Sequence, residues 1–276
     1  MGTTVLTLVE NTAQGTGLLG EHGMSCWVET DRGAVLFDTG QGLGLLPNAE
    51  TLEIDLGKAD AIVLSHGHFD HTGGLRKVLE QTGAKPVFAH PEALAPKYSV
   101  RDGKVREIGI PDARADLEAL GASFCLDEGP VEIIPGVTAT GRVPRVTDFE
   151  RPGENFQSGP KDRLAHDMIW DDQSLILETA EGPVVVTGCA HAGIVNTLLY
   201  ASELAGGKRF TAVVGGTHLV GANEEGLART IEGLRQFDIG RMAPCHCTGF
   251  RGQVGLLNAF GDRFTLNRVG DHLAFA

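Results

Sequence analysis

The chain has 276 residues, of which 23 are Lys or Arg and 36 are Asp or Glu, so its formal net charge is −13. Hydrophobic residues make up 42% and charged residues 21%, which is typical of a globular protein and excludes a disordered or collagen-like chain. The excess of acidic residues argues against broad binding to nucleic acid or to anionic membranes, because both would repel such a surface.

Short β-type runs dominate the first half of the chain. They cover Thr4–Val9, Ser25–Thr30, Ala34–Phe37, Ala61–Leu64 and Pro86–Ala89. Gly33, between the second and third runs, favours a hairpin turn. The continuous apolar run 61–64 predicts a buried strand, and the spacing of apolar residues over 75–79 predicts a helix after it. Residues 100–107 have the pattern of a second hairpin.

Strands and helices alternate more regularly in the second half. The predicted strands are Ser174–Glu178, Val184–Thr187, Phe210–Val214 and a closing strand or hairpin within Phe264–Phe275. Apolar residues at helical spacing predict helices over 194–199 and 227–234, the second with Asn223 as its N-cap. Residues 241–244 lead into Cys245-His246-Cys247.

The stretch 141–163 is polar, rich in Gly and Pro, and without a clear period. A loop of this length is uncommon inside a compact domain and is often functional, so we expect a loop or lid insertion, with a disordered insertion as the alternative. Its cations could attract an anionic substrate, or could simply be solvated. These cations are Arg142, Arg145, Arg151, Lys161 and Arg163.

The two halves of the chain resemble each other weakly. Residues 34–40 match residues 183–189 in apolar pattern, and at the same offset residues 61–64 fall on residues 210–213. Each half would then place a polar loop at the end of a buried strand. We therefore expect residues 1–276 to form a single domain of two similar halves, with one composite site between them.

The five cysteines are odd in number and lack the spacing of a disulfide framework. No apolar run approaches the roughly 18 residues that span a bilayer. Residues 1–10 lack the basic start and long apolar core of a signal peptide. We therefore expect reduced thiols, no membrane partner and a cytoplasmic location.

The strongest chemical signal is the segment Ser65–Gly74, which follows a predicted buried strand and precedes a predicted helix. His66 and His68 lie two apart, so in an extended segment they point the same way, and Asp70 and His71 follow as the chain turns. Imidazole with carboxylate suits zinc, iron or manganese. One ion cannot easily use all four ligands and keep an open position, so the segment predicts two ions. The alternative is a polar loop of solvated histidines.

His66–His71 resembles the His-x-His-x-Asp-His motif of the metallo-β-lactamase superfamily, and Phe37–Gly40 is similar to its strand-end Asp-Thr-Gly. Three later blocks resemble the branch of dihydropterin ribofuranosylaminobenzene-phosphate synthase-like hydrolases. These blocks are Thr187–Gly193, Gly215–Leu219 and Pro244–Gly249. The resemblance covers nearly the whole chain.

The resemblance implies an α/β fold, a four-layer αββα sandwich, with a binuclear metal site at one edge. By the family pattern His66 and His68 bind one ion with a later His, and Asp70 and His71 bind the other with a His near the C-terminus. We assign these later ligands to His191 and His246, because each follows a predicted strand. The alternatives are a helix N-terminal residue for the first and a core histidine between two thiols for the second.

The chain departs from the family pattern at Cys189, where many members carry an Asp that bridges the two metals. A thiolate can bind zinc or iron, so Cys189 is either a ligand or a small buried residue. The histidine that usually precedes this strand has no clear match, although His166 and Asp171-Asp172 lie nearby. Occupancy of the second metal position is therefore left open.

Further residues are expected around the metal ligands. His218 follows a strand and two glycines, and could contact substrate or have a structural role. Asp38 is expected to orient a ligand histidine through its second ring nitrogen, or to cap a turn. Cys245 and Cys247 flank His246 and are expected to support it.

Together these features predict a metal-dependent hydrolase with two divalent ions, zinc first and iron or manganese as alternatives. Activated water would cleave a small, anionic ester, lactone or phosphoester, with Asp70 and His218 as catalytic residues. A non-catalytic metal-binding sensor or scaffold and a di-iron oxidoreductase are the competing hypotheses. The expected partner is a small-molecule substrate, without nucleic acid or membrane, and the oligomeric state is open.

Overall fold

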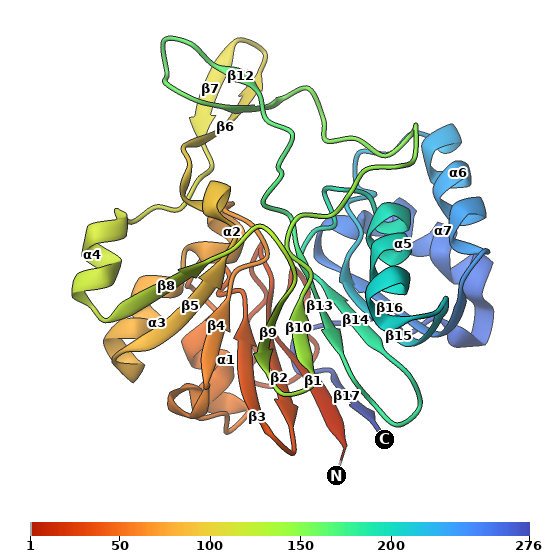
Figure 1. The fold of residues 1–276 in the computed structure, drawn as a ribbon, viewed down its shortest axis with the longest axis horizontal. Helices are drawn as coiled ribbons and strands as arrows, with labels where there is room; N and C mark the ends of the chain where they lie inside the picture. Colours follow the sequence, from red (N-terminus) through yellow and green to blue (C-terminus); the bar gives the residue numbers. More distant parts are fainter. Residues whose placement is uncertain (1) are drawn as a thin grey trace.

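The computed structural model describes residues 2–276, in which two β-sheets face each other and helices cover both outer faces (Figure 1). The first sheet has the strand order β17-β1-β2-β3-β4-β5-β8. Its strands are β1 (Thr3–Val9), β2 (Ser25–Thr30), β3 (Gly33–Phe37), β4 (Ala61–Val63), β5 (Lys85–Ala89), β8 (Ala122–Leu126) and β17 (His272–Phe275). The run from β3 to β8 is parallel.

The second sheet has the order β16-β15-β14-β13-β10-β9. Its strands are β9 (Val131–Ile134), β10 (Val137–Ala139), β13 (Ser174–Leu177), β14 (Val184–Thr187), β15 (Arg209–Gly216) and β16 (Asp238–Cys245). Strands β14, β15 and β16 are parallel to one another. The carboxyl ends of these strands therefore meet at one edge, where parallel sheets commonly carry their functional loops.

Alternation along the strands builds the layers. On β3, Val35 and Phe37 point into the core between the sheets, while Ala34 and Leu36 point toward the outer helices. Helices α1 (Leu45–Thr51), α3 (Leu75–Thr82) and α4 (Arg114–Ala119) cover the first sheet. Helices α5 (Ile194–Ala205), α6 (Glu224–Leu234) and α7 (Gly249–Phe260) cover the second. The expected αββα sandwich is confirmed.

The two sheets share a pairing pattern. Strand β2 pairs antiparallel with β3, which is parallel to β4, and β13 pairs antiparallel with β14, which is parallel to β15. A pair of duplicated halves would show this pattern, and the duplication itself stays a prediction. Within residues 2–276, no helix is long and apolar enough to cross a membrane.

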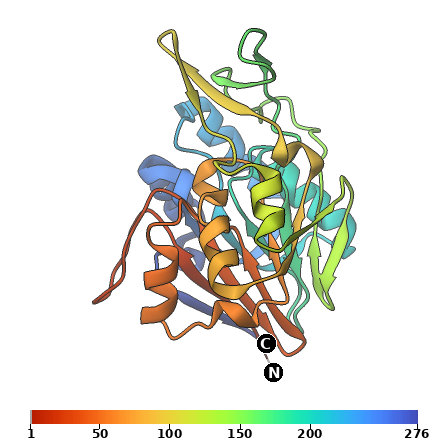
Figure 2. The same ribbon diagram turned by 90° about the vertical axis from the view of Figure 1, so that its left-hand side faces the viewer.

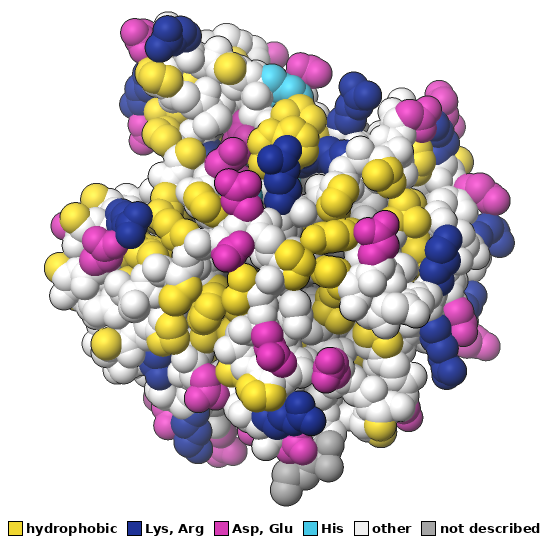
Figure 3. Space-filling model, in the orientation of Figure 1, with side chains coloured by type: hydrophobic (Ala, Val, Ile, Leu, Met, Phe, Trp, Pro, Cys, Tyr) yellow, Lys and Arg dark blue, Asp and Glu magenta, His cyan; other side chains and the backbone are white. Residues whose placement is uncertain are grey.

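A small cap stands above the sandwich in both views (Figures 1 and 2). It is a sheet of order β12-β11-β6-β7, formed by β6 (Lys97–Arg101), β7 (Lys104–Glu107), β11 (Phe156–Ser158) and β12 (Ala165–His166). The predicted hairpin is confirmed as β6–β7. Part of the stretch expected to be a loop is instead strand β11, whose Gln157 pairs with Tyr98 of β6. Over the face shown in Figure 3, acidic and basic side chains are interspersed.

Helix α7 was not expected from the sequence, because Gly249, Gly252 and Gly255 weaken its helical pattern. The structure shows why glycines lie there. A Cβ at Gly252 would lie 2.8 Å from Cβ of Leu219, and one at Gly255 would lie 3.0 Å from Cδ2 of Leu227 on α6. Close packing therefore compensates for low helix propensity.

Candidate metal centre

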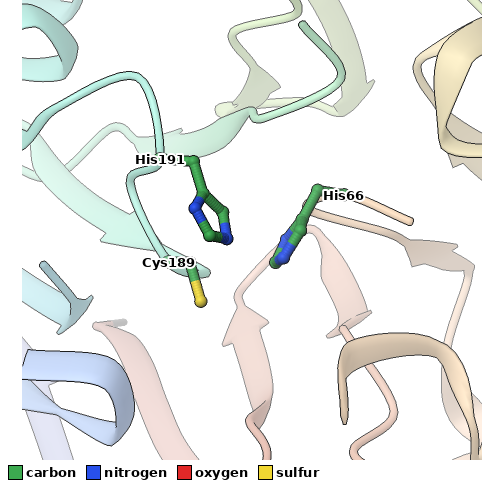
Figure 4. A group of neighbouring side chains, drawn as sticks. All are labelled: His66, Cys189 and His191. Carbon is green, nitrogen blue, oxygen red and sulfur yellow. The ribbon is translucent and has the colours of Figure 1, made fainter. Parts of the chain in front are cut away.

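The predicted ligands gather at the carboxyl ends of the parallel strands. His66 follows β4, Cys189 and His191 follow β14, His218 follows β15, and His246 follows β16. The short helix α2 (Phe69–Thr72) contains Asp70 and His71, and His68 is its N-cap residue. Figure 4 shows the side chains of His66, Cys189 and His191 converging on one point.

The cluster is tightly packed and buried. Nε2 of His66 lies 2.9 Å from Nδ1 of His68, and Nε2 of His71 lies 3.2 Å from Nε2 of His246. Sγ of Cys189 lies 3.2 Å from Nε2 of His71. The structure thus brings together residues from four strand ends that are far apart in the sequence.

Several of these side chains carry donor atoms suited to a metal. In the part of the chain that the structure describes, Nε2 of His68, both ring nitrogens of His191 and Nδ1 of His218 are buried without a hydrogen-bond partner. Buried polar atoms of this kind are costly and are normally satisfied. A metal ion would satisfy these atoms. The donor set therefore fits a divalent ion such as zinc, iron or manganese.

Burial also keeps most of the imidazoles in the form that binds metal. It lowers the pKa of His66 and His191 well below the usual value, the pKa of His68 to about 3 and that of His246 to about 4. Neutral imidazole is the ligand form, so these side chains need lose no proton near neutral pH.

His71 differs because it is paired with a carboxylate. Its Nδ1 donates to Oδ2 of Asp38 at 2.7 Å, and Asp38 also accepts hydrogen bonds from the backbone N–H and the hydroxyl of Ser65. Burial would lower the pKa of His71, but Asp38 and then Asp70 outweigh it and raise that pKa to about 9. The contact expected of Asp38 is present, and it leaves Nε2 of His71 facing the centre.

His246 is oriented by residues that the sequence did not single out. Its backbone N–H donates to Oε1 of Glu10 at 2.7 Å, and its Nδ1 lies 3.0 Å from Oδ1 of Asn11. The expectation that Cys245 supports His246 is wrong, because Cys245 packs in the apolar core between the sheets. Strand β16 ends at Cys245, and Cys247 lies in the short 3₁₀ helix that follows, where its side chain faces the centre instead.

Two consecutive carboxylates hold the ligand loops from behind. Asp171 accepts a hydrogen bond of 2.7 Å from the N–H of Gly67, between His66 and His68. Asp172 accepts one of 2.9 Å from the N–H of Ala192, next to His191. From the sequence alone, this pair is identified only by its position near the strand that a family histidine usually precedes. His166 lies on strand β12 of the cap and is only partly buried, with Nε2 3.3 Å from the carbonyl oxygen of Gly153.

A buried lysine completes this arrangement. Nζ of Lys97, at the start of β6, lies 2.8 Å from Oδ1 of Asp171 and 3.1 Å from Oδ2 of Asp167, and its side chain is 1% exposed. Burial would lower the pKa of Lys97, but the two carboxylates raise it, so the lysine is charged. Lysine in a strand reads as a surface residue, so the sequence contained no signal for it.

His22 also lies at the centre, although it was not predicted. Its Nε2 is 3.2 Å from Oδ2 of Asp70, and its side chain is 60% exposed. Together with His246 these two residues form a group that could hold an ion. A lone histidine in a long N-terminal loop resembles any solvated residue, so only the fold reveals it.

A cavity of about 870 Å³ opens over the centre. His68, Asp70, Cys189, His191, His218 and His246 lie at its floor, and the cap supplies its roof. From the roof, the ring of Phe156 stacks on His68 with centroids 5.3 Å apart. Strand β11 thus covers the metal-facing histidines.

The cations of this cavity are not the predicted ones. Arg101, Lys104 and Arg106 of the β6–β7 hairpin line it, and within residues 2–276 none of them forms an ion pair. By contrast, Arg142 and Arg145 stack on Trp170, with guanidinium-to-ring distances of 3.8 and 4.3 Å. The other three predicted cations also lie outside this cavity: Lys161 pairs with Glu107, Arg151 lines the adjoining cavity, and Arg163 lines neither cavity.

Comparison with known proteins agrees with this geometry. Residues 20–246 match the domain described as the metallo-beta-lactamase superfamily. The chain is 28% identical to a 7,8-dihydropterin-6-methyl-4-(beta-D-ribofuranosyl)-aminobenzene-5'-phosphate synthase of Methanocaldococcus jannaschii, over 92% of this chain and 90% of that protein. It is 35% identical to an uncharacterised protein of the same organism, over 92% and 94%.

A crystal structure shows the same similarity. Tm1679, described as a metal-dependent hydrolase of the beta-lactamase superfamily, has a TM-score of 0.84 and 30% identity, with 98% of both chains covered. Members of this superfamily bind divalent metals, and the residues described here include groups of His, Cys and Asp that could hold an ion. The chain belongs to the metallo-β-lactamase superfamily, whose members are largely metal-dependent hydrolases.

Proposed function

We propose that the protein is a hydrolase with two divalent metal ions, and that zinc is the first candidate for both. One ion would be bound by His66, His68 and His191, the other by Asp70, His71 and His246, with Cys189 between them. The observation that carries this proposal is the position of the Cys189 sulfur. It belongs to one group of donor atoms with His66 and His191, and to another with His71 and His246, each group within 4.8 Å.

Bound divalent ions supply Lewis acidity and lower the pKa of water. Asp70 is suited to orient a nucleophile or to accept its proton. Burial would raise the pKa of Asp70, but the hydrogen bond from His22 and the adjoining imidazoles hold it below the usual range. The carboxylate is therefore ionised throughout the neutral range.

His218 and Phe156 would act on the substrate side of the centre. The ring centroid of His218 lies 4.1 Å from that of His191, and both rings line the cavity. His218 can therefore form a hydrogen bond with an anionic group or a leaving group of the substrate. Phe156, stacked over His68, limits the access of water.

A test of the proposed function is turnover of a panel of esters, lactones and phosphodiesters by zinc-loaded and chelator-treated protein. We expect hydrolysis of at least one class with zinc, loss of hydrolysis after chelation, and recovery on adding zinc back. Metal content is measured on the same samples, so that hydrolysis can be compared with the amount of bound zinc. Bound zinc without turnover of any substrate would instead favour the sensor hypothesis, and bound iron reacting with oxygen would favour the oxidoreductase.

Charge on the hairpin should set the preference for anionic substrates. In the double variant Arg101→Gln/Arg106→Gln we expect KM for an anionic ester to rise about threefold to tenfold, since exposed charge pairs contribute about 0.2–1 kcal/mol each. The KM of a matched neutral ester should stay unchanged. Lys58→Gln, an exposed lysine away from the cavity, serves as the control. An equal rise in KM for both esters would contradict a role of these arginines in recognising the charge of the substrate.

Group transfer at the same centre is a second candidate. The observation that favours it is the similarity to a protein named a synthase, which extends over 92% of this chain. The panel separates the two activities. A phosphate-bearing compound consumed only when an aromatic acceptor is present would indicate transfer, whereas consumption in water alone indicates hydrolysis.

A further inference from the structure

The sulfur of Cys247 is held beside the proposed centre without a role in it. It accepts a hydrogen bond of 3.3 Å from the backbone N–H of His218. It also lies 3.5 Å from the carbonyl oxygen of Cys189, to which its S–H can donate. Both contacts tie Cys247 to the loops that follow β14 and β15.

The backbone around this sulfur leaves room for it. A Cβ at Gly216 would lie 2.6 Å from Sγ of Cys247 and 2.3 Å from the carbonyl oxygen of Gly188. Any side chain at that position would therefore displace the sulfur or the backbone. The strand end is thus compatible with a buried thiol only because residue 216 is glycine.

His218 is turned toward the same point by an unusual backbone conformation. Its φ is +48°, in the left-handed region that non-glycine residues rarely adopt. Nδ1 of its ring is buried without a partner among residues 2–276. This ring nitrogen is therefore available to bind an ion beside the thiols of Cys189 and Cys247.

The three side chains have the separation that a metal requires. One donor atom from each of Cys189, His218 and Cys247 lies within 4.8 Å of the others. Zinc binds sulfur at about 2.3 Å and imidazole nitrogen at about 2.0 Å, so its donors lie roughly 3.5 to 3.8 Å apart in a tetrahedron. Small side-chain rotations suffice to bring three donors within that limit.

We propose that Cys189, His218 and Cys247 form a further metal position, joined to the binuclear centre through the Cys189 sulfur. Two sulfurs and one imidazole favour thiophilic ions such as zinc over magnesium, calcium or manganese. The inference rests on the proposed metal centre and goes beyond it, because the family pattern uses neither Cys247 nor His218. With an ion bound there, His218 would bind the ion and would no longer contact the substrate directly.

The test compares Cys247→Ser with Cys245→Ser. These thiols lie two residues apart and both are buried, but Cys245 packs in the core between the sheets. Zinc content is measured after loading, and the cobalt-loaded proteins are compared by their near-ultraviolet sulfur-to-cobalt charge-transfer band. We expect Cys247→Ser to hold one equivalent less zinc than wild type and to lose about half of the band, while Cys245→Ser retains both.

X-ray absorption at the zinc edge of wild-type protein provides a second measurement that needs no variant to fold. The signal averages over all bound zinc ions, so the proposal expects more than one sulfur neighbour per zinc. An average of one sulfur neighbour per zinc, or a Cys247→Ser protein that matches Cys245→Ser in zinc content and band intensity, would overturn it while the binuclear centre stands. Wild-type protein that binds no zinc at all would overturn the centre itself.

Discussion

His68→Ala is expected to lower kcat/KM for the best substrate of the panel by about a thousandfold. His68 lies in the cluster with Nε2 buried and without a partner in the described chain, facing the cavity. Its loss should remove one ion from the pair. An ion that stabilises developing charge contributes several kcal/mol, and about 1.4 kcal/mol corresponds to a factor of ten. Steady-state kinetics and zinc content of the purified variant measure both effects.

His272→Ala is the matched control, because His272 is an exposed histidine on β17. It should retain wild-type activity and zinc content. Asp70→Ala should behave like His68→Ala, since Asp70 would hold the other ion. Full activity in a His68→Ala protein that contains no metal would contradict the proposed mechanism.

Lys97→Met is expected to lower the free energy of unfolding by about 3–5 kcal/mol. The change leaves the carboxylates of Asp167 and Asp171 buried without their cation, and breaking a buried ion pair from one side has a cost of this size. Chemical denaturation measures the loss directly. The midpoint of thermal unfolding should fall by roughly 10 °C.

Lys104→Met is the control for this change, because Lys104 is exposed on the same hairpin. It should alter stability by less than about 0.5 kcal/mol. Equal stability of the two variants would contradict the inference that the buried ion pair holds the metal loop.

The pH dependence follows from the directions of the two pKa shifts. Burial would raise the pKa of Asp171, but Lys97 lowers it, so the contribution of Asp171 is present above its unfolded pKa and is lost as the pH falls through the folded one. The pKa of Lys97 is raised, so its contribution is present below the unfolded value and is lost at high pH. The difference between wild type and Lys97→Met should therefore be nearly constant between about pH 5 and pH 9.

Much of the sandwich could be predicted because its strands carry their own signal. The apolar run 61–64 is buried on both faces, as the sequence alone predicts, and the strand at 184–187 is also where the sequence places it. Helix α7 could not be predicted, because the reason for its glycines is the surface of Leu219 and Leu227 against which it packs. Strand β11 was hidden for a similar reason, since it pairs with β6, more than fifty residues earlier.

The candidate site divides in the same way. The histidine motif is local, so its spacing indicates metal chemistry without any knowledge of the fold. Glu10, Asn11 and Lys97 act through hydrogen bonds to residues distant in the chain, and nothing near them in sequence indicates this. The roles of individual ligands remain predictions until metal binding is measured.

The position of Lys97 has a consequence for changing what this protein acts on. The residue is the first of strand β6, so the hairpin that carries Arg101 and Arg106 begins at the ion pair that holds Gly67 between two ligand histidines. The cap is therefore not an interchangeable module. A chimaera that exchanges the hairpin for another would keep the metal loop anchored only if its junction retains the lysine and the carboxylates at 167 and 171.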